Sequence, residues 1–543
     1  MSGATQREKH LAFAGVLTVL FLSSLNMTVV GTALPRIIAE LEGFDLYAWA
    51  FTAFSLAATV VLPISGRISD IVGRRRVLMV GIVIFTVAAL LAGLSRSMGE
   101  LIAFRALQGV GGGVLISMSW AAIGDIFAPR ERGRYQGWTG AVFGISSIVG
   151  PVVGGLITDA IGWRWVFFVN VPVALLAFVA VRRFLPKSVR KPDQGLDLPG
   201  TAWLIVATVP TLVGLTWAGV ARPWNDPWVI GAFAVGTIGA IGFVRSQFVS
   251  AQPTLDPRLF RDRTFLFVNV ATLLSAVGLF GAVIYLPLFV QGVQGGSAAA
   301  SGFALAPMMI GVVIGSTVAG ALTSRTGRYR RWVVSGLVAM TVGFALTAGF
   351  GPDTSTLKLV LVMVLLGIGI GPTNSLLTLA AQNALPADRL GAVTGTNQFF
   401  RQIGGTVGVT VFGTIVAAHV RSGLERVLPS GDGGLPASVV DALADPNLLT
   451  DPVRLAAVRD VVVAQVGVDG FDALVHDLRA LLGGGLTEVF WIAVGITVLA
   501  LFAAILLPPA ELSDGERTEE NAAEEGRYAA AGSGSGEVSR ART

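Results

Sequence analysis

The sequence lacks cysteine and is poor in charge and in histidine. With no cysteine among 543 residues, disulfides, thiolate metal sites and cysteine nucleophiles are excluded. Charged residues make up 13% of the chain, about half the fraction typical of soluble domains. The three histidines, His10, His419 and His476, lie outside the apolar runs or at their ends, and no Gly-x-x-x-x-Gly-Lys-Ser/Thr loop is present. We therefore expect no enzyme activity, no metal, no cofactor and no direct drive by ATP.

Long apolar runs dominate what is there. Hydrophobic residues make up 53% of the chain, and the mean hydropathy is +0.71. Runs of about twenty apolar residues match a bilayer core of about 30 Å, and each must be helical because lipid cannot satisfy the backbone of an open strand. The sequence predicts an all-α polytopic membrane protein with fourteen spans. The expected spans are 11–34, 47–69, 77–95, 100–127, 134–158, 163–184, 198–220, 226–247, 264–290, 299–323, 332–350, 357–380, 391–419 and 486–508.

Lysine and arginine are distributed unevenly between alternate loops. Of the 39 such residues, 27 fall in segments on one side of the predicted membrane, 10 fall on the other side, and two, Arg105 and Arg401, lie inside spans. The positive-inside rule makes the basic side cytoplasmic. Both termini are therefore expected in the cytoplasm, with the protein in the cytoplasmic (inner) cell membrane. The net charge of +5 then reports orientation and not a nucleic-acid partner.

The chain contains an internal repeat. Residues 66–76 (GRISDIVGRRR) have a weaker echo in residues 320–331 (GALTSRTGRYRR). The glycine pattern of residues 109–113 recurs at residues 367–371, an offset of 258. Parallel repeats of this kind place a binding site at their interface, near the bilayer midplane.

The repeat predicts two six-helix bundles with two helices inserted between them. The expected organisation is an N-terminal six-helix bundle (1–184), two inserted transmembrane helices (185–250), a C-terminal six-helix bundle with an outside loop at 420–485 (251–508), and a disordered cytoplasmic tail (509–543). Within the loop, residues 451–482 have helical apolar spacing.

The segment after the second span predicts a cytoplasmic gate. Gly66 and Gly73 allow a tight turn and close approach of helices. Asp70 can pair with Arg74 across the cytoplasmic face, and Arg132 after the fourth span is a further member of this gate. For single arginines the alternative is ordinary retention of positive charge in the cytoplasm.

Several motifs, taken in order, resemble those of the major facilitator superfamily, and within it the fourteen-span drug:proton antiporter group. They are residues 66–78 after span 2, 105–113 (RALQGVGGG) in span 4, 150–155 (GPVVGG) in span 5, and 163–165 (WRW) with 170–172 (NVP) at span 6. The resemblance covers roughly residues 10–508. It implies the major facilitator fold with two added helices, and export driven by proton antiport.

Three residues are candidates for proton coupling. Arg105 lies about a turn inside its span, where an unpaired charge is expensive, and the resemblance implies a role in proton transfer or its coupling. The alternative is a snorkelling arginine bonded to backbone carbonyls. Asp125 and Glu488 are the other candidates, because no span carries a carboxylate at the midplane. Asp125 could instead belong to the gate, and Glu488 could be an interfacial residue.

Span 5 carries the motif that the resemblance associates with antiporters. Gly150 and Pro151, with Gly154 and Gly155, combine a helix kink with small faces for close packing. The resemblance implies that this element seals or bends the span in exporters. The alternative is a generic contact between helices.

Span 1 departs from the family pattern. Residues 25–35 (LNMTVVGTALP) match a family motif whose second position is usually aspartate, and here that position is Asn26. An amide carries no proton and does not neutralise a cationic drug, although it can bond to substrate or to a neighbouring helix.

The remaining candidates are expected to line a substrate cavity. Arg401 lies about ten residues into span 13, where it anchors a substrate headgroup or belongs to a structural polar network. Two arginines and no deep acid favour neutral, zwitterionic or anionic amphiphiles over cations. The expected cavity residues are Asn26, Trp49, Phe54, Trp120, Trp138, Tyr285, Asn374, Gln398 and Arg401.

The sequence therefore predicts a secondary active exporter of hydrophobic or amphiphilic small molecules, a multidrug efflux protein that works by proton antiport with alternating access. The alternative is a dedicated exporter of one endogenous lipid, siderophore or antibiotic. The expected partners are a small-molecule substrate, protons and the lipid bilayer, and the protein is expected to act as a monomer.

Overall fold

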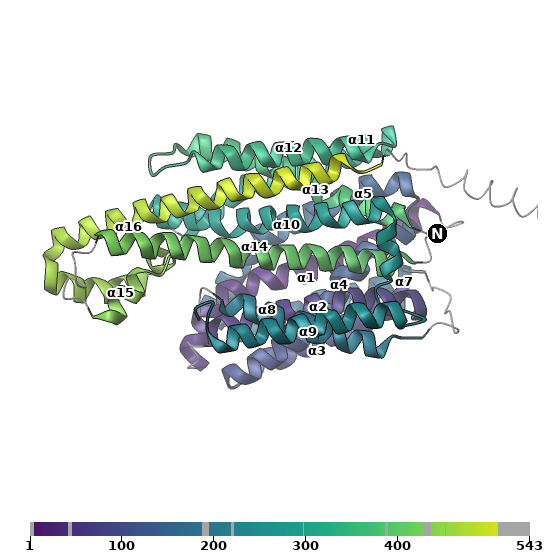
Figure 1. The fold of residues 1–543 in the computed structure, drawn as a ribbon. Helices are drawn as coiled ribbons and strands as arrows, with labels where there is room; N and C mark the ends of the chain where they lie inside the picture. Colours follow the sequence, from purple (N-terminus) through teal and green to yellow (C-terminus); the bar gives the residue numbers. More distant parts are fainter. Residues whose placement is uncertain are drawn as a thin grey trace, which may run out of the picture.

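A computed structural model shows a bundle of long, roughly parallel helices (Figure 1). The structure describes residues 5–41, 46–186, 195–218, 222–296, 298–385, 389–427, 436–450 and 452–508. The predicted tail at 509–543 and parts of the predicted loop at 420–485 lie outside these residues. The first described helix begins, and the last one ends, at the same end of the bundle (Figure 1).

The described residues contain fourteen helices long and apolar enough to cross a membrane, which confirms the predicted all-α fold and number of spans. The first part of the chain forms α1 (Gln6–Leu41), α2 (Tyr47–Val72), α3 (Arg74–Gly93), α4 (Met98–Ile126), α5 (Pro129–Ile161), α6 (Arg164–Phe168) and α7 (Asn170–Phe184). The middle of the chain forms α8 (Leu198–Trp217) and α9 (Pro227–Val249). The last part forms α10 (Arg263–Leu288), α11 (Ala298–Thr326), α12 (Tyr329–Ala348), α13 (Thr356–Ala384), α14 (Leu390–Val427), α15 (Ala437–Leu443) and α16 (Pro452–Ile505). Helices α6 and α7 together make one span.

Local sequence sets many of the helix ends. Asp or Ser side chains accept hydrogen bonds from the first turn of α4, α8, α9, α10 and α13. Between α2 and α3 the chain reverses at Gly73, whose φ of 100° favours glycine. Between α11 and α12 the equivalent residue is Gly327, with a φ of 71°. Both echoed segments therefore turn at a glycine with a positive φ.

The glycine repeat packs the same way in the N-terminal half (α1–α7) and in the C-terminal half (α10–α16). A side chain at Gly109 or Gly113 of α4 would collide with the backbone of α2 at Phe54 and Ala58. A side chain at Gly367 or Gly371 of α13 would collide with the backbone of α11 around Met308 and Val312. Each glycine run thus brings two helices of its own half into backbone contact, as small residues do in membrane helix pairs.

Helices α8 and α9 pack mainly on each other. Gly239 of α9 lies against the backbone of α8 at Val206 and Ala207. Within the described residues, α8 makes the larger contact with the rest of the bundle, through Leu204 and Leu212, which join clusters that include side chains of α2 and α14.

The C-terminal part extends beyond the bundle at the end opposite the two described termini (Figure 1). There α14, α15 and the first half of α16 share an apolar core that continues into α10, α11, α12 and α13. Residues 452–482 are helical, as the spacing predicted, and they continue without a loop into the last span, with a kink at Gly467. Apolar side chains such as Val462 and Leu478 are buried in this extension.

Candidate functional site

The first element of the site is the contact between α2 and α14. Gly66 and Gly391 meet so closely that a side chain on either would collide with the backbone of the other helix. Next to this contact, the carboxylate of Asp70 accepts hydrogen bonds from the backbone N–H groups of Gly391 (3.0 Å) and Ala392 (2.9 Å). These N–H groups begin α14, where the helix dipole favours a negative charge. An acid of the N-terminal half therefore caps a helix of the C-terminal half.

Arg74 ties this acid into a charge network. Its Nη1 donates to Asp70 at 2.8 Å and to the Ser69 hydroxyl at 2.9 Å, and its Nε donates to Asp125 of α4. Asp70 and Arg74 are buried, with 2% and 8% of their side chains exposed, whereas Asp125 is 34% exposed. The structure thus places Asp125, one of the residues predicted for proton coupling, with the gate residues and not beside Arg105.

The second element joins α5 to α11 and α13. Ser324 accepts a bond from the backbone N–H of Arg134 at 3.2 Å, and its carbonyl accepts one from Arg130 at 2.9 Å. Arg132, predicted as a gate residue, donates to Asn383 of α13 at 3.1 Å. We call these two elements together, from Asp70 with Arg74 to Ser324 with Arg132, the lock. The lock connects the two halves at the end of the bundle that holds both described termini.

A buried amide chain continues inward from the lock. Gln136 of α5 donates to Gln382 of α13 at 2.9 Å. Gln382 in turn donates to the backbone carbonyl of Trp120 and to the Thr394 hydroxyl. Sequence reasoning missed Gln382 and Asn383, because an amide in a membrane helix does not indicate which distant helix it will meet. The lock and this chain together link the two halves at this end.

Arg105 is the most deeply buried charge of the N-terminal half, with no exposed surface. Its Nε donates to the Ala50 carbonyl (3.1 Å), and its Nη1 donates to Asn26 (2.8 Å) and Gln108 (2.7 Å). Its guanidinium lies 4.5 Å from the centre of the Phe54 ring. All of these partners are uncharged. Within the described residues, Arg105 therefore keeps its positive charge without an ion pair.

Asn26 lies where the family pattern has an acid, directly against Arg105. The Nη2 of Arg105, the Nδ2 of Asn26 and the Nε2 of Gln108 have no hydrogen-bond acceptor among the described residues. An aspartate at position 26 would form an ion pair with the guanidinium, whereas asparagine accepts one hydrogen bond from it and leaves its own Nδ2 without an acceptor. Gln108 was missed as a site residue, although its spacing of three from Arg105 on one helix was a usable signal.

The glycines of the predicted antiporter motif split into two roles. Gly150 and Gly154 of α5 lie against Thr28 and Thr32 of α1, so that a side chain at either position would collide with a threonine hydroxyl. Thr28 also donates across this contact, to the Ser146 carbonyl at 3.1 Å. Gly155 has open space beside it, and Pro151 is exposed. The motif therefore tightens the packing of α5 on α1, inside the N-terminal half.

Arg401 lies in a second polar network, in the C-terminal half. Its Nη1 donates to the side chain of Asn374, and its Nη2 donates to the Thr378 hydroxyl at 2.9 Å. The Thr378 hydroxyl donates a hydrogen bond to Asn397, and the Asn397 amide donates one to Asn269 on α10. A cavity adjoins this network. It is lined by Ser275, Ala276, Leu279, Met340, Ile370, Thr373, Asn374 and Arg401. Two predicted cavity residues, Asn374 and Arg401, therefore share one cavity.

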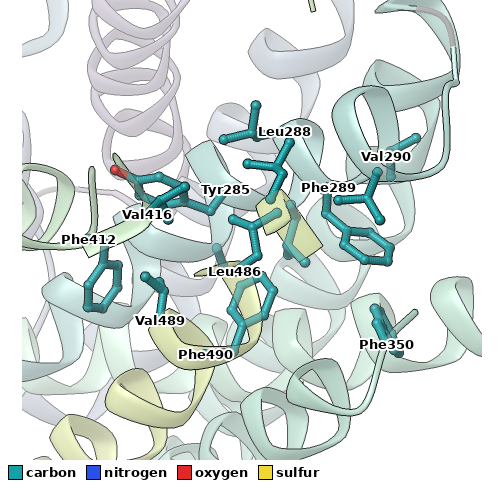
Figure 2. Close-up of a cluster of buried hydrophobic side chains, with 14 of the residues drawn as sticks. Tyr285, Leu288, Phe289, Val290, Phe350, Phe412, Val416, Leu486, Val489 and Phe490 are labelled. Atoms are coloured by element: carbon teal, nitrogen blue, oxygen red, sulfur yellow. The ribbon is translucent and has the colours of Figure 1, made fainter. Parts of the chain in front are cut away.

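The predicted aromatic wall does not assemble in this structure. Tyr285 points into an apolar cluster of the C-terminal half, near Phe412 and Val416, and donates to the Val409 carbonyl at 2.7 Å (Figure 2). Phe54 and Trp120 are buried, and Phe54 supports Arg105. Tyr285 and Phe54 thus belong to apolar clusters inside their halves, because a bundle interior buries large apolar side chains as readily as a cavity wall does.

The other predicted residues are dispersed. Trp49 packs edge-to-face on Trp217 of α8, at a centroid distance of 6.1 Å. Trp138 has 51% of its surface exposed, and Gln398 is buried one turn before Arg401. Glu488 pairs with His419 at 3.2 Å and has 53% of its side chain exposed. Nothing in this geometry brings Glu488 to Arg105 or to Arg401.

Another carboxylate at the same end as Glu488 is held in its charged form. Arg164 and the Trp163 indole (2.9 Å) both donate to Glu40, which follows the first span. These hydrogen bonds lower the pKa of the Glu40 carboxyl. Glu40 therefore stays ionised at neutral pH, which suits a clip between α1 and α6 better than a proton carrier.

The structure has two helical halves, repeated glycine contacts and a charged lock, and comparison with known proteins decides the family. The model of the Major Facilitator Superfamily matches residues 16–409. The chain belongs to the Major Facilitator Superfamily. It is 34% identical over 516 residues to the multidrug transporter protein MdtP of Bacillus subtilis, covering 94% of this chain and 95% of that protein. It is 31% identical over 509 residues to multidrug resistance protein 3 of the same organism, covering 94% and 97%.

Solved structures of this superfamily show the same fold. The human organic anion transporter MFSD10 matches with a TM-score of 0.59 and 18% identity, covering 91% of this chain and 99% of that one. The proton:xylose symporter XylE matches with a TM-score of 0.57 and 12% identity, covering 94% and 98%. These likenesses establish the fold alone. The sequence relatives establish that this member of the superfamily is an efflux transporter related to multidrug transporters, which confirms the predicted family and the prediction of a transporter, not an enzyme.

Proposed function

We propose that this transporter exports hydrophobic or amphiphilic small molecules in exchange for protons, by alternating access. The observation that supports this proposal is the lock, which joins the halves at one end through Asp70, Arg74 and Ser324. A transporter of this kind opens its two ends in turn by rocking one half against the other. Among the described residues, the hydrogen bonds between the halves gather toward this end, and a rocking motion that opens it has to break them.

The end that carries the lock is the cytoplasmic end in this proposal. The loops at this end hold most of the lysine and arginine, as the positive-inside rule requires. Both termini then lie in the cytoplasm, and the structure corresponds to a state closed toward the cytoplasm. The extension around α15 is then outside the cell.

Two residues have proposed roles in proton coupling. Arg105 supplies a fixed positive charge inside the N-terminal half, where it raises the cost of any further cation nearby. Asp125 is the more exposed of the two carboxylates on Arg74, so it is the one that protons reach first. Protonation of Asp125 would remove one of the two ion pairs of Arg74 and weaken the lock. Glu488 has no part in this scheme, because it is exposed and paired with His419.

Proteoliposomes test the proposal directly. Uphill transport of an amphiphilic dye under an imposed pH gradient should stop when the gradient is dissipated, and its persistence would remove the proton coupling. Arg105→Gln should reduce this transport by at least about tenfold, because the charge inside the half is lost. Arg96→Gln is the matched control, since Arg96 is an exposed arginine just before the same helix and should leave transport unchanged.

Export of one endogenous product is a second candidate function. The observation that favours it is Asn26 against Arg105, which lacks the acid that would attract cationic drugs. Small molecules released by the source cell should be compared with and without this gene. Loss of one released compound, with unchanged sensitivity to toxic dyes, would support this function over multidrug export.

A further inference from the structure

We propose that the cavity beside Arg401 is an anion subsite that binds the acidic headgroup of an amphiphilic substrate. This proposal rests on the proposed function, because it names the class of substrate that the exporter takes. It concerns the C-terminal half only, and it makes no use of Arg105 or the lock.

The first argument is depth. Arg401 comes about eleven residues after the start of α14, which corresponds to about 17 Å along the helix and so to the middle of a bilayer core. An arginine at this depth is expensive unless it meets a wet cavity or a charged partner. Arg401 lines a cavity and is only partly buried, unlike Arg105, which has no exposed surface.

The second argument is charge. The described partners of Arg401, which are Asn374 and Thr378, are neutral. The sequences of α10, α12 and α13 contain no aspartate or glutamate, and α14 has none before Glu425, six turns beyond Arg401. The positive charge is therefore not neutralised by the helices that line the cavity.

The third argument is unused hydrogen-bonding capacity. The Nε of Arg401 and the Nε2 of Gln398 are buried and have no acceptor among the described residues. Gln398 precedes Arg401 by three residues, so both side chains lie on the same face of α14. Buried donors without acceptors are rare in folded proteins, and an anionic oxygen in the cavity supplies the acceptor that the Nε of Arg401 lacks.

The cavity wall combines polar and apolar side chains. Besides Arg401, its polar members are Ser275, Thr373 and Asn374, and the rest are apolar, among them Leu279 and Met340. The cavity has room for about one water-sized group, so a headgroup oxygen of the substrate meets Arg401 there and the alkyl or ring portion lies outside the cavity. A cation would meet repulsion from Arg401 at the same place.

The test uses a matched pair of fluorescent probes, 11-(dansylamino)undecanoic acid and its methyl ester, which differ only in the charge of the headgroup. The purified full-length protein, in nanodiscs of zwitterionic lipid, should bind the acid about tenfold more tightly than the ester. Arg401→Gln should abolish this preference by weakening the acid, while the Kd of the ester changes by less than about threefold. The control Arg96→Gln should keep the preference of the unmodified protein.

Three results would overturn the proposal. These are equal binding of acid and ester by the unmodified protein, binding of neither, and a preference that survives Arg401→Gln. If Arg401→Gln does not fold, Ser275→Met fills the cavity with the arginine in place, and it must weaken the acid at least tenfold. Unchanged acid binding by that variant would also overturn the proposal.

Two further measurements complete the test. One shows whether the bound anion is a substrate or a lipid, and the other shows whether a failure belongs to the subsite or to the proposed function. Repeating the titration in nanodiscs of anionic lipid shows whether a membrane phosphate competes for the site; loss of acid binding there would assign the site to lipid and overturn the substrate role. Dye transport driven by a pH gradient is measured on the same preparations. Absence of that transport with an intact, Arg401-dependent acid preference would refute the proposed function and leave the subsite in place.

Discussion

Two of the contacts between the halves have similar close backbone packing and different chemistry. In one, Gly66 of α2 meets Gly391 of α14, and in the other, Gly320 of α11 meets Gly133 of α5. The second pair is related to the first by the repeat, at offsets of 254 and 258 residues. One turn further in, Gly395 lies against the α2 backbone as Gly137 lies against the α11 backbone.

The difference lies in the polar residues beside the glycines. On the α2–α14 side, Asp70 accepts hydrogen bonds from two backbone N–H groups and forms an ion pair with Arg74. The equivalent residue on the α5–α11 side is Ser324, whose hydroxyl accepts one backbone bond from Arg134. Hydrogen bonds to a charged group contribute about 1.5–3 kcal/mol and neutral ones about 0.5–1.5 kcal/mol. Close packing is therefore shared by both contacts, and arginines donate across the α5 side as well, whereas a buried carboxylate that accepts backbone bonds across the contact is found beside the α2–α14 glycines.

The largest effect should come from the close glycine packing that both contacts share. Gly66→Val and Gly320→Val each place a side chain against the backbone of the opposite helix, which cannot yield without separating the halves. We expect each to reduce transport by more than about tenfold and to depopulate the closed state. Spin labels at Arg76→Cys and Arg331→Cys, on exposed ends of α3 and α12, would report this as longer distances, and the absence of native cysteine makes the labelling specific.

Gly231→Val in α9 is the control for these substitutions. A side chain at this helical position meets open space, so it tests the cost of replacing a helix glycine alone. If Gly66→Val depopulated the closed state and Gly320→Val did not, the two contacts would not be equivalent in their packing.

The next largest effect should come from the Asp70 carboxylate at the α2–α14 contact. Asp70→Asn keeps the size of the side chain but removes its charge and leaves Arg74 with Asp125 as its remaining ion pair. We expect the closed state to lose about 1.5–3 kcal/mol, which is about 10- to 150-fold in the ratio of closed to open molecules. The same pair of spin labels measures this ratio. A distance distribution like that of the unmodified protein would show that the charge of Asp70 does not hold the halves together.

Most of the fold and part of the site were predictable from the sequence. The apolar runs and alternating loop charges indicate the spans because lipid tolerates few alternatives to a helix. Asp70 and Arg74 are four residues apart around a glycine turn, so their pairing follows from local spacing. Gln382 and Asn383 could not be predicted, because their partners lie about 250 residues away and depend on how the halves dock.

Aromatic residues show a second limit. Tyr285 and Phe54 were predicted to line a cavity, and the structure buries them inside the two halves. An aromatic ring on a membrane helix is equally compatible with lipid, bundle interior and cavity, because all three are apolar. Arg401 was more informative, because a charge has few acceptable places in a membrane, and the structure places it at a cavity.

The smallest effect should come from the Ser324 hydroxyl, which takes the place of the Asp70 carboxylate on the α5–α11 side. Ser324→Ala removes the hydroxyl that accepts from Arg134, while the Arg130 bond to the Ser324 carbonyl remains. We expect a loss of about 0.5–1.5 kcal/mol, less than about fifteenfold in the ratio of closed to open molecules. The spin-label distances should therefore shift less than in Asp70→Asn. An equal or larger shift would mean that the two contacts contribute equally to closure, and that the charge at Asp70 serves another purpose than closing this end of the transporter.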